Sequence, residues 1–184
     1  VRPPQSVWVM GAFHSIAAAG ESIERFLAHS FSVEPPIVGS NTKVVRVRTE
    51  DLPGHALAED IDRPALSVFL YRVDFTKIVR AAWSAVGSQD GRSHLALDLH
   101  FLLTPWAKNA HDEYLILGRT LQCLEDTPIL TGPLLHPVAK GLPQESIQMC
   151  LEDIPTEELM RTFDSLPGHY KLSVPYVARI VRID

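Results

Sequence analysis

The chain has 184 residues, of which 46% are hydrophobic and 21% charged, so it can bury the core of one globular domain without disulfides. Its formal net charge of -5 argues against a surface that binds nucleic acid and against an anionic membrane as a partner. No run of 18 apolar residues is present to span a membrane. We expect a loose segment over residues 1–10 and a single domain over residues 11–184.

Periodicity in the first half of the chain predicts a helix followed by two strands. The helix is expected over residues 11–30, because apolar or small residues recur there every three or four positions. They are Phe13, Ile16, Gly20, Ile23 and Leu27. Strands are expected at residues 43–48 and 66–74. The second is apolar on both faces except at Arg72, a pattern typical of a strand buried on both sides.

The longest regular strand pattern is at residues 94–103, which we expect at the centre of the sheet. Successive side chains of a strand point to opposite faces, so one face here is apolar and the other is mixed. The apolar face has Leu95, Leu97, Leu99, Phe101 and Leu103, and the mixed face has Ala96, Asp98, His100 and Leu102. Thr104-Pro105 is expected to end the strand, because proline has no N–H to donate to the ladder.

The second half of the chain begins with a predicted helix over residues 109–125. Asn109 can cap its first turn, with Asp112 in the position of the capping-box acid. The predicted inner stripe of this helix is Tyr114, Leu117, Leu121 and Leu124. Residues 126–145 contain four prolines and two glycines and are expected to be mostly loop.

Three further elements complete the predicted domain. Strands are predicted at residues 146–151 and 171–183, with a short helix between them at residues 156–166. Pro175 is expected to place the last strand at an edge of the sheet or at a bulge. The order of elements predicts an α/β (α+β) fold with a mixed sheet of about five strands flanked by helices.

The strongest candidate for chemistry is the pair Asp98 and His100, which lie two positions apart on one strand and point the same way. One interpretation is a metal pair, or a base with an orienting carboxylate, in a small metal-dependent hydrolase. The other is a polar patch at a strand end or subunit contact, which the lack of a third ligand at a recognisable spacing favours. Serine-elbow, phosphate-loop and His-x-x-x-His motifs are absent, and Cys123 and Cys150 do not make a zinc site. No catalytic residue and no cofactor are therefore expected.

Residues 75–93 form a long connection, and long loops often carry function. Arg80, Trp83 and Arg92 make this loop a candidate docking element, because aromatic and arginine side chains are enriched in protein interfaces. Trp83 and Trp106 both lie in or beside predicted loops. For each of them two roles are open: an interface anchor, or a cover for the edge of the core.

Four stretches of the chain together resemble one protein family. They are Leu66–Val73 (LSVFLYRV), Leu95–Pro105 (LALDLHFLLTP), Leu117–Leu130 (LGRTLQCLEDTPIL) and Tyr170–Asp184 (YKLSVPYVARIVRID). Because they occur in order and at consistent spacing, the chain from about residue 10 to residue 184 resembles the N-terminal domain of one structural protein. That protein is the cap, or tail terminator, of extracellular phage-tail-like contractile injection systems.

The resemblance implies an α/β tail-terminator fold and a structural role rather than an enzyme. It implies a homo-hexameric ring that closes the distal end of the inner tube and sheath. The implied partners are the tube and sheath proteins, and no catalytic residue is carried over. Such a protein is expected in the cytoplasm during assembly and afterwards in a released extracellular particle.

Overall fold

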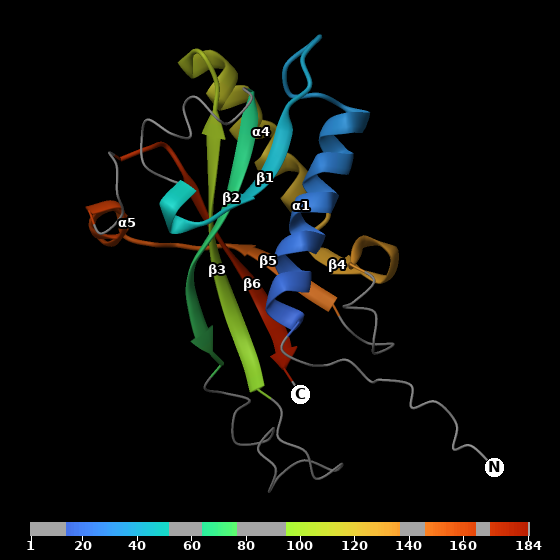
Figure 1. Ribbon diagram of the computed structural model, residues 1–184, viewed down its shortest axis with the longest axis vertical. Coiled ribbons are helices and arrows are strands. Elements are labelled where there is room, and N and C mark those ends of the chain that lie inside the picture. The colour runs from blue at the N-terminus through green and yellow to red at the C-terminus, as the bar shows by residue number, and fades with distance from the viewer. Residues whose placement is uncertain (1–13, 52–63, 77–94, 137–145, 165–169, 184) are drawn as a thin grey trace, which may run out of the picture.

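The computed structural model describes residues 14–51, 64–76, 95–136, 146–164 and 170–183, which are built around one mixed sheet (Figure 1). The described residues contribute six strands in the spatial order β1-β2-β3-β6-β5-β4. They are β1 Lys43–Val47, β2 Ala65–Phe75, β3 Leu95–Trp106, β4 Ile129–Thr131, β5 Ser146–Leu151 and β6 Val174–Ile183. β1 pairs with β2 in parallel, and the other neighbouring pairs are antiparallel. The predicted mixed α+β architecture is confirmed.

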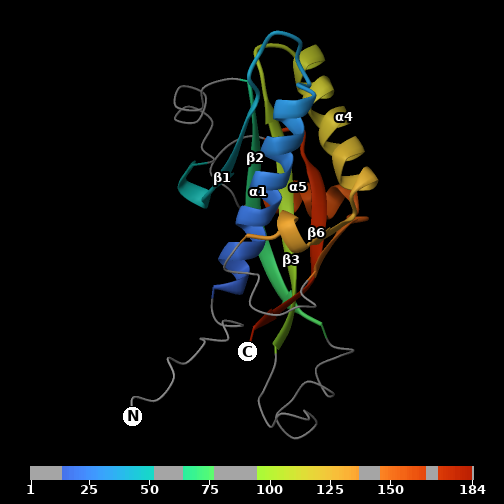
Figure 2. The same cartoon turned by 90° about the vertical axis from the view of Figure 1, so that its right-hand side faces the viewer.

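Helices cover both faces of this sheet. Within the described ranges the helical elements are α1 Ser15–Val33, α4 Ala110–Asp126 and α5 Thr156–Asp164, with the 3₁₀ turns η1 Thr49–Asp51 and η2 Gly132–Leu134. α1 and α4 lie on one face, where Arg119 and Glu34 join them through an ion pair of 2.8 Å (Figure 2). α5 lies on the opposite face.

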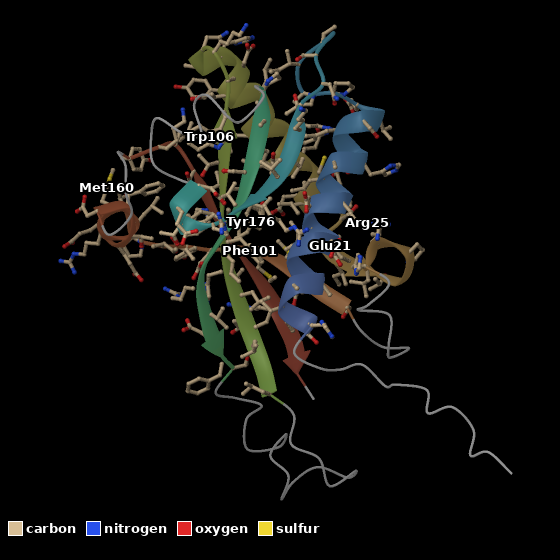
Figure 3. All side chains as sticks on the ribbon, in the orientation of Figure 1. Glu21, Arg25, Phe101, Trp106, Met160 and Tyr176 are labelled. Carbon is tan, nitrogen blue, oxygen red and sulfur yellow. The ribbon has the colours of Figure 1, made fainter. Side chains whose placement is uncertain are left out.

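The main core lies between β3 and the helices α1 and α4. Its β3 members are Leu97, Leu99, Phe101 and Leu103, which are all buried, whereas Leu95 at the start of the strand is 41% exposed. Phe101 pairs with Tyr176 of β6 near the middle of the sheet (Figure 3). A smaller cluster on the α5 face joins Leu102 to Phe69 and Phe163. The prediction of β3 as a central strand with a buried leucine face is therefore confirmed.

The prediction that Thr104-Pro105 ends β3 is wrong, because the strand continues to Trp106. β6 pairs with β3 only as far as Leu103, so Pro105 has a strand neighbour on one side alone, where it faces Leu66 of β2. Proline is tolerated at such one-sided positions, because its missing N–H leaves no ladder hydrogen bond unmade.

The prediction for Pro175 is also wrong. β6 is not an edge strand, since it lies between β3 and β5, and its register shift is opposite Leu97 and Leu99, away from the proline. Pro175 is the second residue of β6, and the pairing with β5 begins one residue later, at Tyr176. Its carbonyl oxygen still accepts the N–H of Glu152 at 3.0 Å. The beginning of a strand is a place where proline is accepted.

Two other predictions, for the burial of β2 and for the loop after α4, are corrected by the structure. Only the first part of β2 is buried on both faces: Val73 and Phe75 are 44% and 43% exposed, because β1 ends opposite Phe69. β4, within the segment predicted to be mostly loop, adds a sixth strand and buries Leu130 completely. Its three residues are too few to show a periodic pattern.

The helix α4 begins where it was predicted to begin, but the prediction of its core-facing residues is partly wrong. The side-chain oxygen of Asn109 accepts the N–H of Asp112 at 2.9 Å, which confirms the cap. Tyr114, predicted to face inward, is 61% exposed, and the core side of the helix is Ile116, Leu117, Thr120, Cys123 and Leu124.

Candidate functional site

A cluster of charged side chains lies on the α5 face of the sheet. We call it the Arg72–His100 cluster, and it consists of Tyr71, Arg72, Asp74, His100, Glu152 and Glu158. A bulge in β2 between Leu70 and Arg72 creates it, because the extra residue Tyr71 brings Arg72 opposite His100 of β3. Opposed residues of neighbouring strands share one face, so the two side chains meet there.

His100 is the buried centre of the cluster, at 6% exposure. Its Nδ1 lies 2.8 Å from the Glu152 carboxylate, and its Nε2 lies 3.2 Å from Asp74 Oδ2. Glu152 follows β5 directly, so this contact fixes the connection between β5 and α5 onto the middle of the sheet.

Arg72 supplies the compensating positive charge. Its guanidinium donates to Glu152 Oε1 at 3.0 Å, its Nε lies 3.0 Å from Asp74, and its third nitrogen reaches Glu158 of α5 at 3.4 Å. Arginine suits this position because its planar group presents several donors in a fixed fork. The three carboxylates of the cluster are thus each bound to a cation of the same chain.

The Tyr71 hydroxyl completes the cluster by donating to Glu152 Oε2 at 3.2 Å. Burial, and then the negative charge of Glu152, raise the pKa of Tyr71 above its ordinary value. The phenol therefore stays protonated and serves as a hydrogen-bond donor rather than as a base.

Asp98 and His100 do not form a shared site. Asp98 accepts a hydrogen bond from Thr76 Oγ1 at 3.1 Å, whereas His100 is bound to Glu152 and Asp74. Among the residues that the structure describes, no three His, Cys, Asp or Glu side chains are placed to hold a metal ion. The arrangement supports cross-linking of the sheet to α5, and nothing in it supports the hydrolase alternative.

The predicted interface residues fall into two groups. Arg80, Trp83 and Arg92 lie outside the described residues. Trp106 is 7% exposed, and its indole N–H donates to Ser67 Oγ at 2.9 Å. Trp106 is therefore buried in the protomer, and its role in an interface stays a prediction.

Sequence reasoning missed an exposed apolar stripe on α4. Tyr114 and Leu115 are 61% and 40% exposed, and the exposed Gly118 follows at helical spacing. The signal in the sequence was the surplus of apolar residues over what one core face needs, since Tyr114 and Leu115 lie off the buried side of the helix. In the described part of the chain, no helix is both long enough and apolar enough to cross a membrane.

Comparison with solved structures finds a similar fold. One similar chain is the sheath/tube terminator, in the extended state, of PVC, an extracellular contractile injection system. The TM-score is 0.61 at 16% sequence identity. The similarity covers 91% of this chain and 56% of that chain, so this chain spans a little over half of the length of the solved terminator. Among proteins with curated descriptions, none matches this chain significantly.

The predicted resemblance and tail-terminator-like fold are confirmed by this structure and by a family model. The model describes the Pvc16 N-terminal domain, and it matches residues 18–184. Because this match covers almost the whole sequence, the chain belongs to the Pvc16 N-terminal domain family.

Proposed function

We propose that this protein is a structural cap that terminates the tube and sheath of a phage-tail-like contractile injection system. The observation that carries the proposal is the family match over residues 18–184. The fold similarity to a solved sheath/tube terminator over 91% of the chain supports it independently of any single motif.

The Arg72–His100 cluster supports a structural role rather than an enzymatic one. Glu152 takes contacts from His100, Arg72 and Tyr71, so its oxygens are engaged within the protomer. A general base needs a free path to a substrate proton. The cluster instead braces the β5–α5 connection.

A cap on a tube of six-fold symmetry needs a contact that repeats head to tail and closes into a ring. We therefore propose a homo-hexamer whose partners are the inner tube and the sheath proteins. The loop with Arg80, Trp83 and Arg92 is proposed as one contact, with a neighbouring subunit or with the sheath. Assembly in the cytoplasm, before release of the extracellular particle, follows from this role.

The test is complementation of particle-producing cells that lack the protein. Purified particles are imaged by electron microscopy, and the length and the distal end of each particle are scored. We expect uncapped tails of variable length without the protein and capped tails of uniform length when it is restored. Capped, uniform tails in its absence would refute the proposed function.

A further inference from the structure

The outer face of α4 carries two large apolar side chains, Tyr114 and Leu115, that the protomer leaves exposed among polar neighbours. Its residues recur at helical spacing and are all exposed: His111, Tyr114, Leu115, Gly118, Gln122 and Glu125. We call them the α4 stripe. Tyr114 and Leu115, in the second turn of α4, expose 61% and 40% of their surface, which are high values for large apolar side chains. Exposed aromatic and aliphatic groups placed together are typical of a protein contact.

Gly118 is a second feature of the α4 stripe that indicates a contact with another molecule. Glycine inside a helix is less stable than alanine, so a glycine at such a position calls for a reason. Among the described residues, a Cβ added at Gly118 would meet no atom within 4 Å, so this part of the protomer gives no reason to exclude alanine. The reason is then a close approach from outside, which glycine permits beside Tyr114 and Leu115.

The C-terminal end of α4 carries a charge that its own helix does not balance. Glu125 and Asp126 are exposed there, and the last turn has no basic residue. The helix dipole places partial negative charge at the same end, which makes the two carboxylates unfavourable. A partner with a positive charge at this end would relieve the repulsion.

The chain offers a complementary surface on α1. η2 covers the first half of the helix, where the N–H of His136 donates to Ser22 Oγ at 2.7 Å. The second half is open, and we call its exposed residues the α1 stripe: Arg25, Ala28, His29, Ser32 and Val33. Val33 is 70% exposed, and Arg25 points outward from the helix without an ion pair in the described part of the protomer (Figure 3).

The two stripes match when the helices are set antiparallel. Val33 then faces Tyr114 and Leu115, the small Ala28 faces Gly118, and Arg25 reaches Glu125 and Asp126. At 1.5 Å per residue, Arg25 lies about 12 Å from Val33, and Glu125 lies about 15 Å from Leu115. The arginine side chain spans the difference.

We propose that the α1 stripe of one copy of this chain docks antiparallel on the α4 stripe of a second copy. The occupant is assigned by charge complementarity, because the unpaired arginine of one stripe meets the unbalanced carboxylates of the other. The two stripes are different surfaces of one protomer, so the contact is head to tail and can repeat around a ring. The inference rests on the proposed function, and it names the surfaces through which the cap closes.

The test is a charge swap in complemented particle-producing cells. Arg25→Glu alone, and Glu125→Arg with Asp126→Arg, each place like charges together, which is expected to weaken association by roughly tenfold or more. The triple variant restores opposite charges and is expected to restore capped tails. Arg161→Glu is the control, because Arg161 lies on the other face of the sheet, where it pairs with Glu157 of the same helix. Thermal melting of each purified variant verifies that it folds.

Gly118→Ala gives a second test, because it is expected to raise the stability of the protomer while it lowers capping. Removing a helix glycine is expected to raise the thermal midpoint of the protomer by roughly 2–4 °C. The added methyl group is expected to lower the fraction of capped tails, because it separates the two helices.

The outcomes separate this inference from the function on which it rests. If wild-type protein does not cap tails, the proposed function falls. If it caps tails and the Arg25, Glu125 and Gly118 variants cap them equally well, the α1–α4 contact is wrong and the function stands. If a variant loses capping but still forms an intact ring in native mass spectrometry, the tube or the sheath binds the α4 stripe. The assignment of a second copy of this chain as its partner would then be wrong.

Discussion

His100 Nδ1 and the carboxylate of Glu152 lie 2.8 Å apart, although 52 residues separate them in the chain. The contact joins the middle of β3 to the residue that follows β5. Tyr71 and Arg72 of β2 donate to the same carboxylate. One acidic side chain thus ties β2 and β3 to the β5–α5 connection.

Replacing His100 by alanine is expected to destabilise the protein by about 1–3 kcal/mol, because the contacts to Asp74 and Glu152 are lost at a buried position. Asp98→Asn, a change at a partly exposed position, is expected to stay within about 0.5 kcal/mol. Denaturant unfolding measures both. Under permissive conditions both variants are expected to cap tails, and a specific loss of capping by a fully folded variant would contradict the structural role of the pair.

Leu99→Ala is expected to cost about 2–5 kcal/mol, because Leu99 is 0% exposed and its truncation leaves a cavity under α1 and α4. Leu95→Ala on the same face of β3 is the matched control, since Leu95 is 41% exposed and loses much less buried area. Equal costs for the two substitutions in urea unfolding would show that the centre of the sheet has been misplaced.

The hydrogen bond between Trp106 and Ser67 predicts a coupling. Ser67→Ala leaves the buried indole N–H without its acceptor and is expected to cost about 1–3 kcal/mol. In a Trp106→Phe background the same substitution is expected to cost less, because no donor remains. A double-mutant cycle measures the difference, and additive costs would exclude the bond.

Tyr176 predicts a loss of stability at high pH. Burial, and then the charge of Glu125, raise its pKa to about 12, whereas the unfolded chain has the ordinary value of about 10. Its contribution to the free energy of unfolding is therefore complete below about pH 10 and is lost as the pH rises through about 12. Tyr176→Phe is expected to lose less stability over this range than the wild type. Equal slopes of stability against pH would contradict the raised pKa.

The loop containing Arg80, Trp83 and Arg92 is expected to contribute to capping. Replacing residues 80–92 by a short Gly/Ser linker is expected to give uncapped tails of variable length in electron micrographs. Restoring only Trp83 and the two arginines within the linker tests whether these side chains carry the effect. Normally capped tails with the linker would remove the loop from the mechanism.

Local patterns in the sequence were enough for most of the elements. The alternation of β3 and the helix cap at Asn109 are encoded in neighbouring residues, and the structure confirms both. The consequences of Pro105 and Pro175 are not local, because they depend on where the adjacent strands begin and end. A proline disrupts pairing only on the side where a neighbouring strand would accept a hydrogen bond from its N–H.

The candidate site was predictable only in part for the same reason. Alternation on β3 correctly placed Asp98 and His100 on the less apolar face, but the partners of His100 come from β2 and from beyond β5. The bulge at Tyr71 aligns Arg72 with His100, and no glycine or proline lies beside it that would have allowed its prediction from the sequence. On α4, more apolar residues are present than one core face takes, and only tertiary packing decides that Tyr114 faces outward.

The position of β6 between β3 and β5 has a consequence for synthesis on the ribosome. In a chain translated only as far as Leu151, β1, β2 and β3 can pair with one another and β4 can pair with β5, but the strand that joins the two groups has not yet been made. Residues 174–183 must emerge before the sheet can close, so folding of this domain is completed late and the nascent chain exposes two open strand edges until then.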